Sequence, residues 1–525
     1  WLDQKAIPAE DSLFSLLVKG YQILKFRWVS GKELHRGVAR TSLKKPILFL
    51  TTSGENEIAY TARFLKKNRH AAAIFMVRRP LYYTLKGAQH ELLRSAALQS
   101  QIARALRKAV SDVSDRMLFC TDTPQLTAMY NGLGVCKFHT LSIPHTLQPT
   151  SRDPRGKIQI AYIGDARTEK GFLHLPDIVR TIRQSELRDQ VEFFIQCNFN
   201  IPGGEPGIAQ ALEELRALGP DGITFAETPL DRESYVRVLQ ESDIVLLMYD
   251  RGLYRERSSG ILVEALSAGA TVLAPSGSWL ESECGPLLHR WNTEMIEGST
   301  LVETHDLLDE SLLLDRKFRK KADISANSIP DVFGARVLQG GVFCVSAGRF
   351  GFLHVHKSGL AGDIFTLRMD TRLVVNPRIF DIEIEFLDAS GQVLAHLSRQ
   401  YFVYLPASER TPAAGHLADS EQAFICPEGT ASVRVSFTND YSNANLLLKD
   451  IVCSFRQRSG VSHNTTSALI YGEPEEAGAE LLAELRRRQN GGHVPAPYPG
   501  RDYHNPKFFV DSLIELQENV KTKRP

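Results

Sequence analysis

The spacing of hydrophobic and polar residues divides the chain into parts with different periods. From about Pro46 to residue 330, short apolar runs alternate with helical stretches, and the runs include ILFLTT, AAAIFMV and IQIAYIG. Strands that alternate with helices predict a parallel sheet covered on both faces. The alternation fills two successive stretches, so we expect an α/β fold with two Rossmann-like domains, residues 1–150 and 151–335.

The period changes at about Gly340, where apolar and polar residues begin to alternate singly. The clearest case is FDIEIEF at 380–386, which is followed by the turn residues Asp388 to Gly391. Single alternation predicts strands with one face in water. Several such strands joined by Gly, Pro, Asn and Asp turns predict an all-β sandwich at 338–457.

This all-β region resembles the jelly-roll modules that bind carbohydrate. Tyr401, Tyr404 and Tyr441 could stack on sugar rings, although tyrosines in a sandwich also serve as core or rim residues. Carbohydrate binding is therefore one hypothesis for the region, and a structural or oligomerising role is the other.

Both ends of the chain differ from these parts. Residues 11–29 predict an amphipathic helix with basic residues beside apolar ones. Such a helix either lies on an anionic membrane surface or packs against its own domain. Residues 458–525 turn polar and predict a helical tail or linker. The chain starts at Trp1 rather than Met, so we expect residues upstream, and a further domain could follow Pro525.

Composition and charge argue against several classes of protein. The 525 residues are 43% hydrophobic and 23% charged, with a formal net charge of +1, so there is no basic excess to suggest nucleic acid as a partner. Seven cysteines are scattered without CxxC or Cys/His spacing, which argues against a disulfide framework or a zinc site and for a reducing compartment. No apolar run approaches the roughly 20 residues that span a bilayer, and no signal peptide is visible. We therefore expect a cytoplasmic protein.

The stretch ERSSGILVEALSAGATVLA, residues 256–274, carries the strongest chemical signal. Ser258 and Ser259 can cap a helix that Gly269 ends, and an apolar strand follows. A helix N-terminus presents free backbone N–H groups and the positive end of the helix dipole, and Gly260 leaves room for a ligand to approach the backbone. The sequence therefore predicts an anion site here, most naturally for a phosphate.

Two carboxylates frame this predicted anion site. Glu256 precedes the helix and Glu264 lies within it. Carboxylates so placed suit the hydroxyls of a sugar or a ribose rather than a phosphate. The combination predicts a nucleotide-sugar site, and the alternative is an ordinary helix of a βαβ unit with solvated glutamates.

A second candidate segment follows the run IQIAYIG. Gly164 ends the predicted strand, Arg167 and Lys170 follow it, and Gly171 precedes a helix. Open α/β sheets bind ligands at the carboxyl ends of their strands, and two cations there can neutralise a diphosphate. Lys-Gly after a turn is common, but this segment and the first one both lie at strand ends of the same half, in the right order for one site.

The first segment resembles the Glu-x7-Glu motif of retaining GT-B glycosyltransferases of the family-4-like group. Glu256 and Glu264 have the spacing of that motif, in which the first Glu lies near the donor sugar and the second binds the ribose. One position departs from the family pattern, because Gly260 lies four residues after Glu256 where the family has Gly three residues after. Glu264 is therefore the firmer correspondence.

The second segment resembles the Gly-Arg-Leu-x3-Lys-Gly signature of the same family, whose Arg and Lys bind the donor diphosphate. Gly164 and Lys170 keep that spacing, whereas Arg167 lies three residues after Gly164 instead of one. Lys170 is therefore the firmer correspondence here. The resemblance covers about residues 46–330 and is strongest over 157–280.

In the first half, polar residues at two predicted strand ends are candidates for the acceptor side. The loop SGENE at 53–57 follows one strand, and Arg78 and Arg79 follow the next. The arginines could meet an anionic acceptor or form a solvated pair. His90 and His145 are the histidines of interest, and a structural role is the alternative for each.

The resemblance implies a fold and an activity. It implies a GT-B enzyme that moves a sugar from a nucleotide-diphosphate sugar to a glycan or lipid-linked glycan acceptor, with retention and without a metal or a further cofactor. In this reading Lys170 and Arg167 bind the diphosphate, the amides of Ser258 to Gly260 bind phosphate or sugar, and Glu256 lies near the sugar. Those groups would stabilise negative charge on the departing diphosphate.

The resemblance also leaves alternatives for the role of the chain. Bacterial surface-polysaccharide synthesis is plausible by analogy, with possible peripheral contact at the inner face of the membrane and no nucleic acid partner. One rival is a catalytically degenerate GT-B protein that only binds glycan. Another is a glycoside phosphorylase on the same fold, in which free phosphate replaces the nucleotide.

Overall fold

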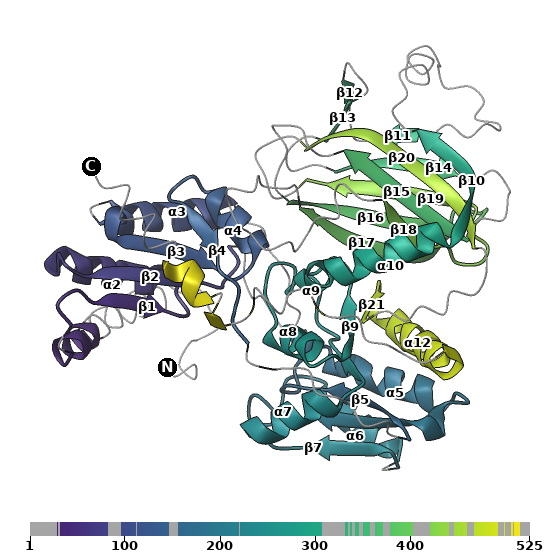
Figure 1. The fold of residues 1–525 in the computed structure, drawn as a ribbon, viewed down its shortest axis with the longest axis horizontal. Coiled ribbons are helices and arrows are strands. Elements are labelled where there is room, and N and C mark those ends of the chain that lie inside the picture. Colours follow the sequence, from purple (N-terminus) through teal and green to yellow (C-terminus); the bar gives the residue numbers. More distant parts are fainter. Residues whose placement is uncertain are drawn as a thin grey trace, which may run out of the picture. The chain divides into compact units, whose positions relative to one another are not determined.

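The chain forms two compact units in the computed structural model, Trp1–Ser142 with Lys507–Pro525, and Ile143–Pro506 (Figure 1). The structure describes residues 29, 32–41, 43–81, 96–111, 113–145, 147, 156–219, 221–306, 331–333, 336–338, 342–345, 350–357, 363–370, 379–402, 421–439, 446–458, 467–491, 498, 504, 506–507 and 509–514. The predicted helix over 11–29, apart from Val29, lies outside the described residues, as do His90, Tyr404 and Tyr441.

The first unit contains a parallel sheet of four strands in the order β1-β2-β3-β4. The strands are β1 (Ile47–Leu50), β2 (Ala72–Val77), β3 (Met117–Thr121) and β4 (Phe138–Thr140), and the helices are α2 (Glu55–Lys67), α3 (Ala96–Val110) and α4 (Pro124–Asn131). β3 is buried along its whole length, as expected for a strand covered on both faces. The alternation of strands and helices predicted for this half is confirmed.

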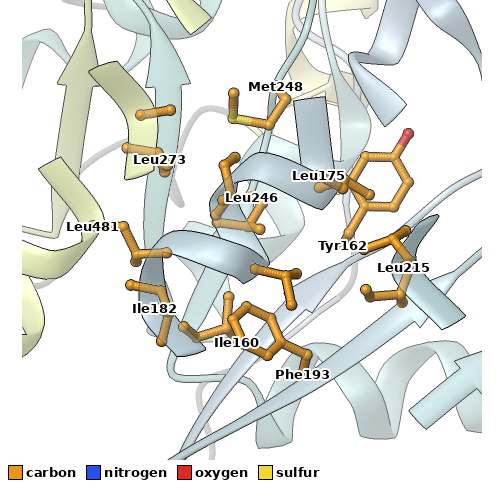
Figure 2. Close-up of a cluster of buried hydrophobic side chains, with 14 of the residues drawn as sticks. Ile160, Tyr162, Leu175, Ile182, Phe193, Leu215, Leu246, Met248, Leu273 and Leu481 are labelled. Atoms are coloured by element: carbon orange, nitrogen blue, oxygen red, sulfur yellow. The ribbon is translucent and has the colours of Figure 1, made fainter. Parts of the chain in front are cut away.

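The second unit contains a parallel sheet of six strands in the order β21-β9-β8-β5-β6-β7. The strands are β5 (Ile158–Tyr162), β6 (Val191–Gln196), β7 (Ile223–Ala226), β8 (Ile244–Leu246), β9 (Thr271–Pro275) and β21 (Ala468–Tyr471). The helices are α5 (Leu175–Arg183), α6 (Ile208–Ala217), α7 (Arg232–Glu241), α8 (Gly260–Ser267), α9 (Trp279–Glu283), α10 (Gly285–Glu297) and α12 (Ala477–Gly491). Buried side chains from the strands and from α5, α6 and α12 form one apolar core (Figure 2).

The tail predicted to be a linker differs from the structure. β21 extends the six-stranded sheet by pairing with β9, and α12 packs against α5. Leu481 of α12 lies in the same core as Leu273 of β9 (Figure 2). Residues 468–491 are therefore part of the α/β domain, and the expected boundary at 458 does not describe them.

The core position of Leu481 gives a test of this assignment. Leu481→Ala should lower the free energy of unfolding by about 3 kcal/mol, because it removes buried methyl groups and leaves a cavity. The neighbouring Leu482 is only partly buried, so Leu482→Ala should cost clearly less. Equal and small losses for both variants in denaturant titrations would contradict the placement of α12 in the core.

The region between β9 and β21 forms two antiparallel sheets, with strand orders β12-β13-β20-β15-β18 and β11-β14-β19-β16-β17. Their strands are β10 (Ser299–Asp306), β11 (Asp331–Phe333), β12 (Arg336–Leu338), β13 (Val342–Val345), β14 (Phe350–His356), β15 (Ile364–Asp370), β16 (Ile379–Leu387), β17 (Val393–Phe402), β18 (Gln422–Ile425), β19 (Ser432–Thr438) and β20 (Leu446–Arg458). Buried side chains of both sheets share one apolar core. Along β16 the apolar residues Phe380, Ile382 and Ile384 are fully buried, as predicted, but Asp381 on the other face is buried as well.

The antiparallel region begins earlier than the predicted boundary at 338. β10 pairs with β20 from Ser299↔Arg458 to Asp306↔Val452. A strand assigned to the α/β half from the sequence therefore belongs to an antiparallel sheet.

Among the described residues, no helix is both long enough and apolar enough to cross a membrane.

Candidate functional site

The two segments singled out in the sequence lie at the same edge of the six-stranded sheet. One follows β5, and the other leads from β8 into α8. β5 and β8 are parallel neighbours, so their carboxyl ends lie side by side. A Cβ placed on Gly164 would lie 3.4 Å from Cδ1 of Ile261 in α8. The structure therefore brings both segments into one site.

Lys170 folds back over Gly164. Its Nζ lies 2.5 Å from the position that a Cβ on Gly164 would take, and the φ of Gly164 is +118°. Side-chain-bearing residues rarely adopt that backbone conformation, and a side chain here would collide with the ammonium group. The Gly164 N–H donates to Oε1 of Gln196 at the end of β6, at 2.8 Å. The glycine thus leaves the space that the lysine occupies.

The Lys170 ammonium is partly buried and forms no hydrogen bond or ion pair with any residue that the structure describes. Burial lowers its pKa below the ordinary 10.5, and the nearby charges of Arg167 and Arg257 lower it further, against the opposite effect of Asp165 and Glu169. A cation that has lost part of its hydration without gaining a close counter-ion favours the binding of an anion. This lysine is the clearest sign of an anion site.

Arg167 has partners of its own. Its Nη2 forms an ion pair with Oδ2 of Asp165, and its Nη1 lies 3.6 Å from Oε1 of Glu169. Asp165 also accepts a hydrogen bond from Nδ2 of Asn198 at 2.9 Å. Of the two cations predicted from the sequence, only Lys170 is left without an ion pair by the described residues.

Arg257 is a third cation at the site, and the sequence interpretation missed it. Its Nη1 donates to Oε2 of Glu169 at 3.2 Å, and its guanidinium lies 4.9 Å from the ring centroid of Tyr254. The stacking and the ion pair fix the arginine beside the residue that precedes Lys170. Three positive side chains therefore surround the end of β5.

The N-terminus of α8 has the predicted cap. Ser259 Oγ accepts a hydrogen bond from the Leu262 N–H at 3.4 Å. Gly260 is exposed, and a Cβ added to it would meet nothing within 4 Å. Ser258 is partly exposed. The first turn of α8 is therefore open to a ligand, and the helix dipole adds positive potential there.

Glu264 lies one turn into α8 and is held by a tyrosine. The hydroxyl of Tyr235 on α7 donates to Oε2 of Glu264. Burial raises the pKa of Glu264 above its ordinary value, while the Tyr235 hydrogen bond and the charge of Arg232 act in the opposite direction. Oε1 of this partly buried carboxylate has no hydrogen-bond donor among the described residues, and a carboxylate oxygen is suited to accept hydroxyl donors.

The raised pKa of Glu264 gives a prediction on stability. A carboxyl group whose folded-state pKa is raised stabilises the fold only while it is protonated, and that contribution is lost as the pH rises through the folded-state pKa. At pH 7.5 the ionised carboxylate is therefore a cost, and Glu264→Gln should raise the melting temperature of the ligand-free protein. The gain should shrink as the pH falls through the raised folded-state pKa and should be absent below the ordinary value of 4.5. A melting temperature that falls at pH 7.5 would contradict this reasoning.

Glu256 lies deeper than the other predicted site residues. It is 1% exposed, and its Oε1 lies 3.9 Å from Nε of Arg255. The resemblance to the family motif implied a position near the donor sugar for this carboxylate. In the structure it lies below the surface of the site, where it faces an arginine.

The candidates of the first unit have structural partners. Arg78 Nε forms an ion pair with Oδ2 of the buried Asp122 at 2.7 Å. Arg79 is exposed, and its carbonyl accepts from the Tyr130 hydroxyl. In the loop SGENE, Oε2 of Glu57 accepts from the Gly54 N–H at the start of α2. The loop therefore caps a helix, and Arg78 is committed to Asp122.

His145 lies in the second unit and is buried. Its Nε2 lies 3.1 Å from Oγ of Ser267 at the end of α8, and its backbone N–H donates to the carbonyl of His504. These contacts are those of a structural histidine, the alternative considered for it. Within the described residues, no group of three or more His, Cys, Asp or Glu is arranged to hold a metal ion.

Several polar residues of the site escaped the sequence interpretation. Gln196 ends β6 and Asn198 follows it. Glu205 accepts from the Thr168 N–H at 2.8 Å and from Nδ2 of Asn200 at 2.8 Å. A usable signal did exist, because the polar residues after the run VEFFIQ stand at the carboxyl end of the next parallel strand. Tyr235 had no such signal, since it lies within a helix.

Several solved structures are similar to this chain at low sequence identity. No protein-family model and no curated protein matches it. The structure titled "OtsA apo structure" is 11% identical with a TM-score of 0.35, covering 49% of this chain and 63% of that one. A UDP-forming trehalose-phosphate synthase from Burkholderia xenovorans is 12% identical with a TM-score of 0.36, covering 51% and 65%. TarM is 11% identical with a TM-score of 0.32, covering 45% and 41%.

The chain therefore spans less than two thirds of the length of each of these proteins.

Proposed function

We propose that this protein is a GT-B glycosyltransferase of the family-4-like, retaining type, which uses a nucleotide-diphosphate sugar as donor. The single observation that carries the proposal is Lys170, a partly buried ammonium group without an ion pair among the described residues. It lies over Gly164 at a strand end, and the same glycine lies close to Ile261 in the first turn of α8. A diphosphate has the charge and the size that such a position requires.

The departing nucleoside diphosphate accounts for the arrangement of charges. Lys170 would bind one phosphate as a point charge, and the first turn of α8, from Ser258 to Gly260, would bind phosphate or sugar through backbone N–H groups. Arg167 and Arg257 supply further positive potential from the two sides. Fixed positive groups of this kind stabilise charge that develops on a leaving diphosphate, which accelerates transfer.

The carboxylates would bind the uncharged parts of the donor. Glu264 accepts a hydrogen bond from Tyr235 through Oε2, so its other oxygen can accept the hydroxyls of a ribose. Glu256 would act next to the sugar, as in the family motif. No cofactor beyond the donor itself and no metal enters this scheme.

The acceptor in this proposal is a glycan or a lipid-linked glycan. The two antiparallel sheets with their common core support a β-sandwich of the jelly-roll kind, which could bind carbohydrate. Bacterial surface-polysaccharide synthesis in the cytoplasm, with peripheral contact at the inner face of the membrane and no nucleic acid partner, fits such an acceptor. These points extend the resemblance seen in the sequence.

A second function has one observation in its favour. Glu256 is only 1% exposed, so a protein that binds a nucleotide or a glycan without transferring sugar would also fit the site. Release of nucleoside diphosphate from a donor sugar separates the two functions, because only the enzyme catalyses it. Loss of that release in Lys170→Met would exclude the binding-only function.

A thermal-shift screen tests the proposed site. Nucleoside diphosphates and their sugar conjugates should raise the melting temperature, since a ligand that binds only the folded state stabilises it. The shift should vanish in Lys170→Met and shrink in Glu264→Ala. Lys157→Met is the matched control, because Lys157 precedes the opposite end of β5 and pairs with Glu192 at 3.3 Å. No shift with any nucleotide, together with a shift by phosphate and glycan, would favour a phosphorylase.

A further inference from the structure

Residues 249–259 lie in the loop between β8 and α8 and are called the site loop. The site loop has contacts on two sides. On one side it carries Arg257 to the nucleotide site. On the other side Arg251 and Arg255 point to acidic residues outside the six-stranded sheet. Three arginines of one short loop therefore tie it to three different carboxylates.

The Arg255 contact reaches the antiparallel region. Nη2 of Arg255 forms an ion pair with Oδ2 of Asp381, which lies on β16 and is 6% exposed. The Arg255 side chain is 18% exposed and the Asp381 side chain 8% exposed. Little water is therefore available to replace either partner of the pair. Loss of Asp381 would remove a buried carboxylate that faces Arg255 in addition to Glu256, whose Oε1 lies 3.9 Å from Arg255 Nε, and breaking a buried pair is costly. Arg255 is therefore held against β16.

The Arg251 contact reaches the same sheet by a second route. Nη2 of Arg251 lies 2.9 Å from Oε1 of Glu473, which is also 3.4 Å from Nδ1 of His396 on β17. Nη1 of Arg251 donates to the carbonyl of Gly472. A Cβ on Gly472 would lie 2.1 Å from the carbonyl oxygen of His396, so the chain passes directly against β17 here.

On the side of the nucleotide site, the site loop contacts Glu169, the residue before Lys170. The backbone N–H of Asp250 donates to the carbonyl of Glu169 at 2.9 Å, and Arg257 pairs with the Glu169 side chain at 3.2 Å. A continuous series of contacts thus runs from Asp381 through Arg255 and the loop backbone to Glu169. Lys170 is the next residue along the chain.

We propose that Asp381 is a positioning residue for the nucleotide site, acting through Arg255 on the site loop. The antiparallel region is then a structural part of the donor site, in addition to any carbohydrate binding of its own. The expected effect on nucleotide affinity rests on the proposed function, whereas the expected effect on the site loop rests on the contacts alone. The two effects can be measured separately.

The variant Asp381→Asn tests the inference, with Glu385→Gln as its matched control. Glu385 lies on the same strand and forms an ion pair with Arg434 of β19 at 2.7 Å, so its replacement removes a similar charge from the sheet. Hydrogen–deuterium exchange of peptides covering 249–259 reports on the loop without any ligand. Calorimetric titration with UDP, GDP, ADP and dTDP reports on the site.

Asp381→Asn should accelerate exchange of the site loop and weaken the binding of the preferred nucleotide by about tenfold. Glu385→Gln should change neither. Asp381→Glu, which restores the charge, should return both toward wild type. In the double variant with Arg255→Gln the two losses of affinity should be less than additive, because both changes remove the contact between Arg255 and Asp381.

The outcomes separate the inference from the proposed function. Wild-type exchange of the site loop in Asp381→Asn would overturn the inference, whatever the nucleotide titration gives. Faster exchange in a protein that binds none of the four nucleotides would support the link to the loop and would refute the nucleotide site. If Asp381→Asn does not fold, Arg255→Lys replaces it as the test, because lysine keeps the charge but lacks the planar fork of arginine. Arg255→Lys should accelerate hydrogen exchange of the site loop to a smaller extent. Unchanged exchange of the loop in this variant would also overturn the inference.

Discussion

Replacing Lys170 by methionine should lower kcat/KM for sugar transfer by about 10²- to 10³-fold, the effect of losing one preorganised charge-stabilising group. The lysine is the cation of the site that carries no ion pair with the described residues, whereas Arg167 and Arg257 are paired with carboxylates and replace it only in part. Methionine keeps the length and the apolar stem of the side chain and removes the charge. Steady-state kinetics with the donor found in the thermal-shift screen measure the effect.

The stability of Lys170→Met separates loss of function from loss of fold. Because the folded-state pKa of Lys170 is lowered from 10.5, its charge destabilises the folded protein at neutral pH, and the cost is relieved as the pH rises through that lowered pKa toward 10.5. The variant should therefore melt at or above the wild-type temperature at pH 7.5. Lys157→Met should keep full activity. Equal rates for wild type and Lys170→Met would contradict the role of this lysine.

Gly171→Ala should destabilise the protein by about 5 kcal/mol or more, a loss that requires a specific structural cause. The cause is a backbone collision, since the new Cβ would lie 1.7 Å from the carbonyl oxygen of Met248, and the φ of Gly171 is +71°. The left-handed conformation adds a further penalty of about 1–2 kcal/mol for any residue with a Cβ. Thermal or denaturant unfolding measures the loss.

Gly260→Ala is the matched control for this prediction. Gly260 also lies at the site, but a Cβ there would meet nothing within 4 Å, so its stability should equal that of the wild type. A Gly171→Ala protein that melts at the same temperature as Gly260→Ala would contradict the close approach of the β5 and β8 segments. Insoluble Gly171→Ala together with soluble Gly260→Ala would agree with it.

The sequence predicted the parts of the fold that local pattern determines. Apolar runs separated by helical stretches identified the strands of both parallel sheets except β21, and single alternation identified β16. The candidate site could be predicted for the same reason, because a strand end followed by Gly164 and Lys170 is a local feature. Its convergence with α8 follows from parallel strands that end at one edge.

The parts that the sequence did not predict depend on pairing between distant segments. β21 is only four residues long, and nothing within ALIY indicates that its partner is β9 on the far side of the antiparallel region. The strand β10 had no visible period that assigned it to β20. Asp381 and Tyr235 are single polar residues whose partners, Arg255 and Glu264, are set by the tertiary structure.

One measurement tests the central claim most directly. It compares the affinities for a nucleoside diphosphate and for the corresponding monophosphate, in the wild type and in Lys170→Met. If Lys170 binds the diphosphate, titration calorimetry should show the diphosphate of the preferred base binding at least about tenfold more tightly than the monophosphate in the wild type, since each charge-assisted contact contributes about 1.5–3 kcal/mol. The variant should bind both nucleotides with similar, weak affinity. The same preference for diphosphate in both proteins would contradict the site.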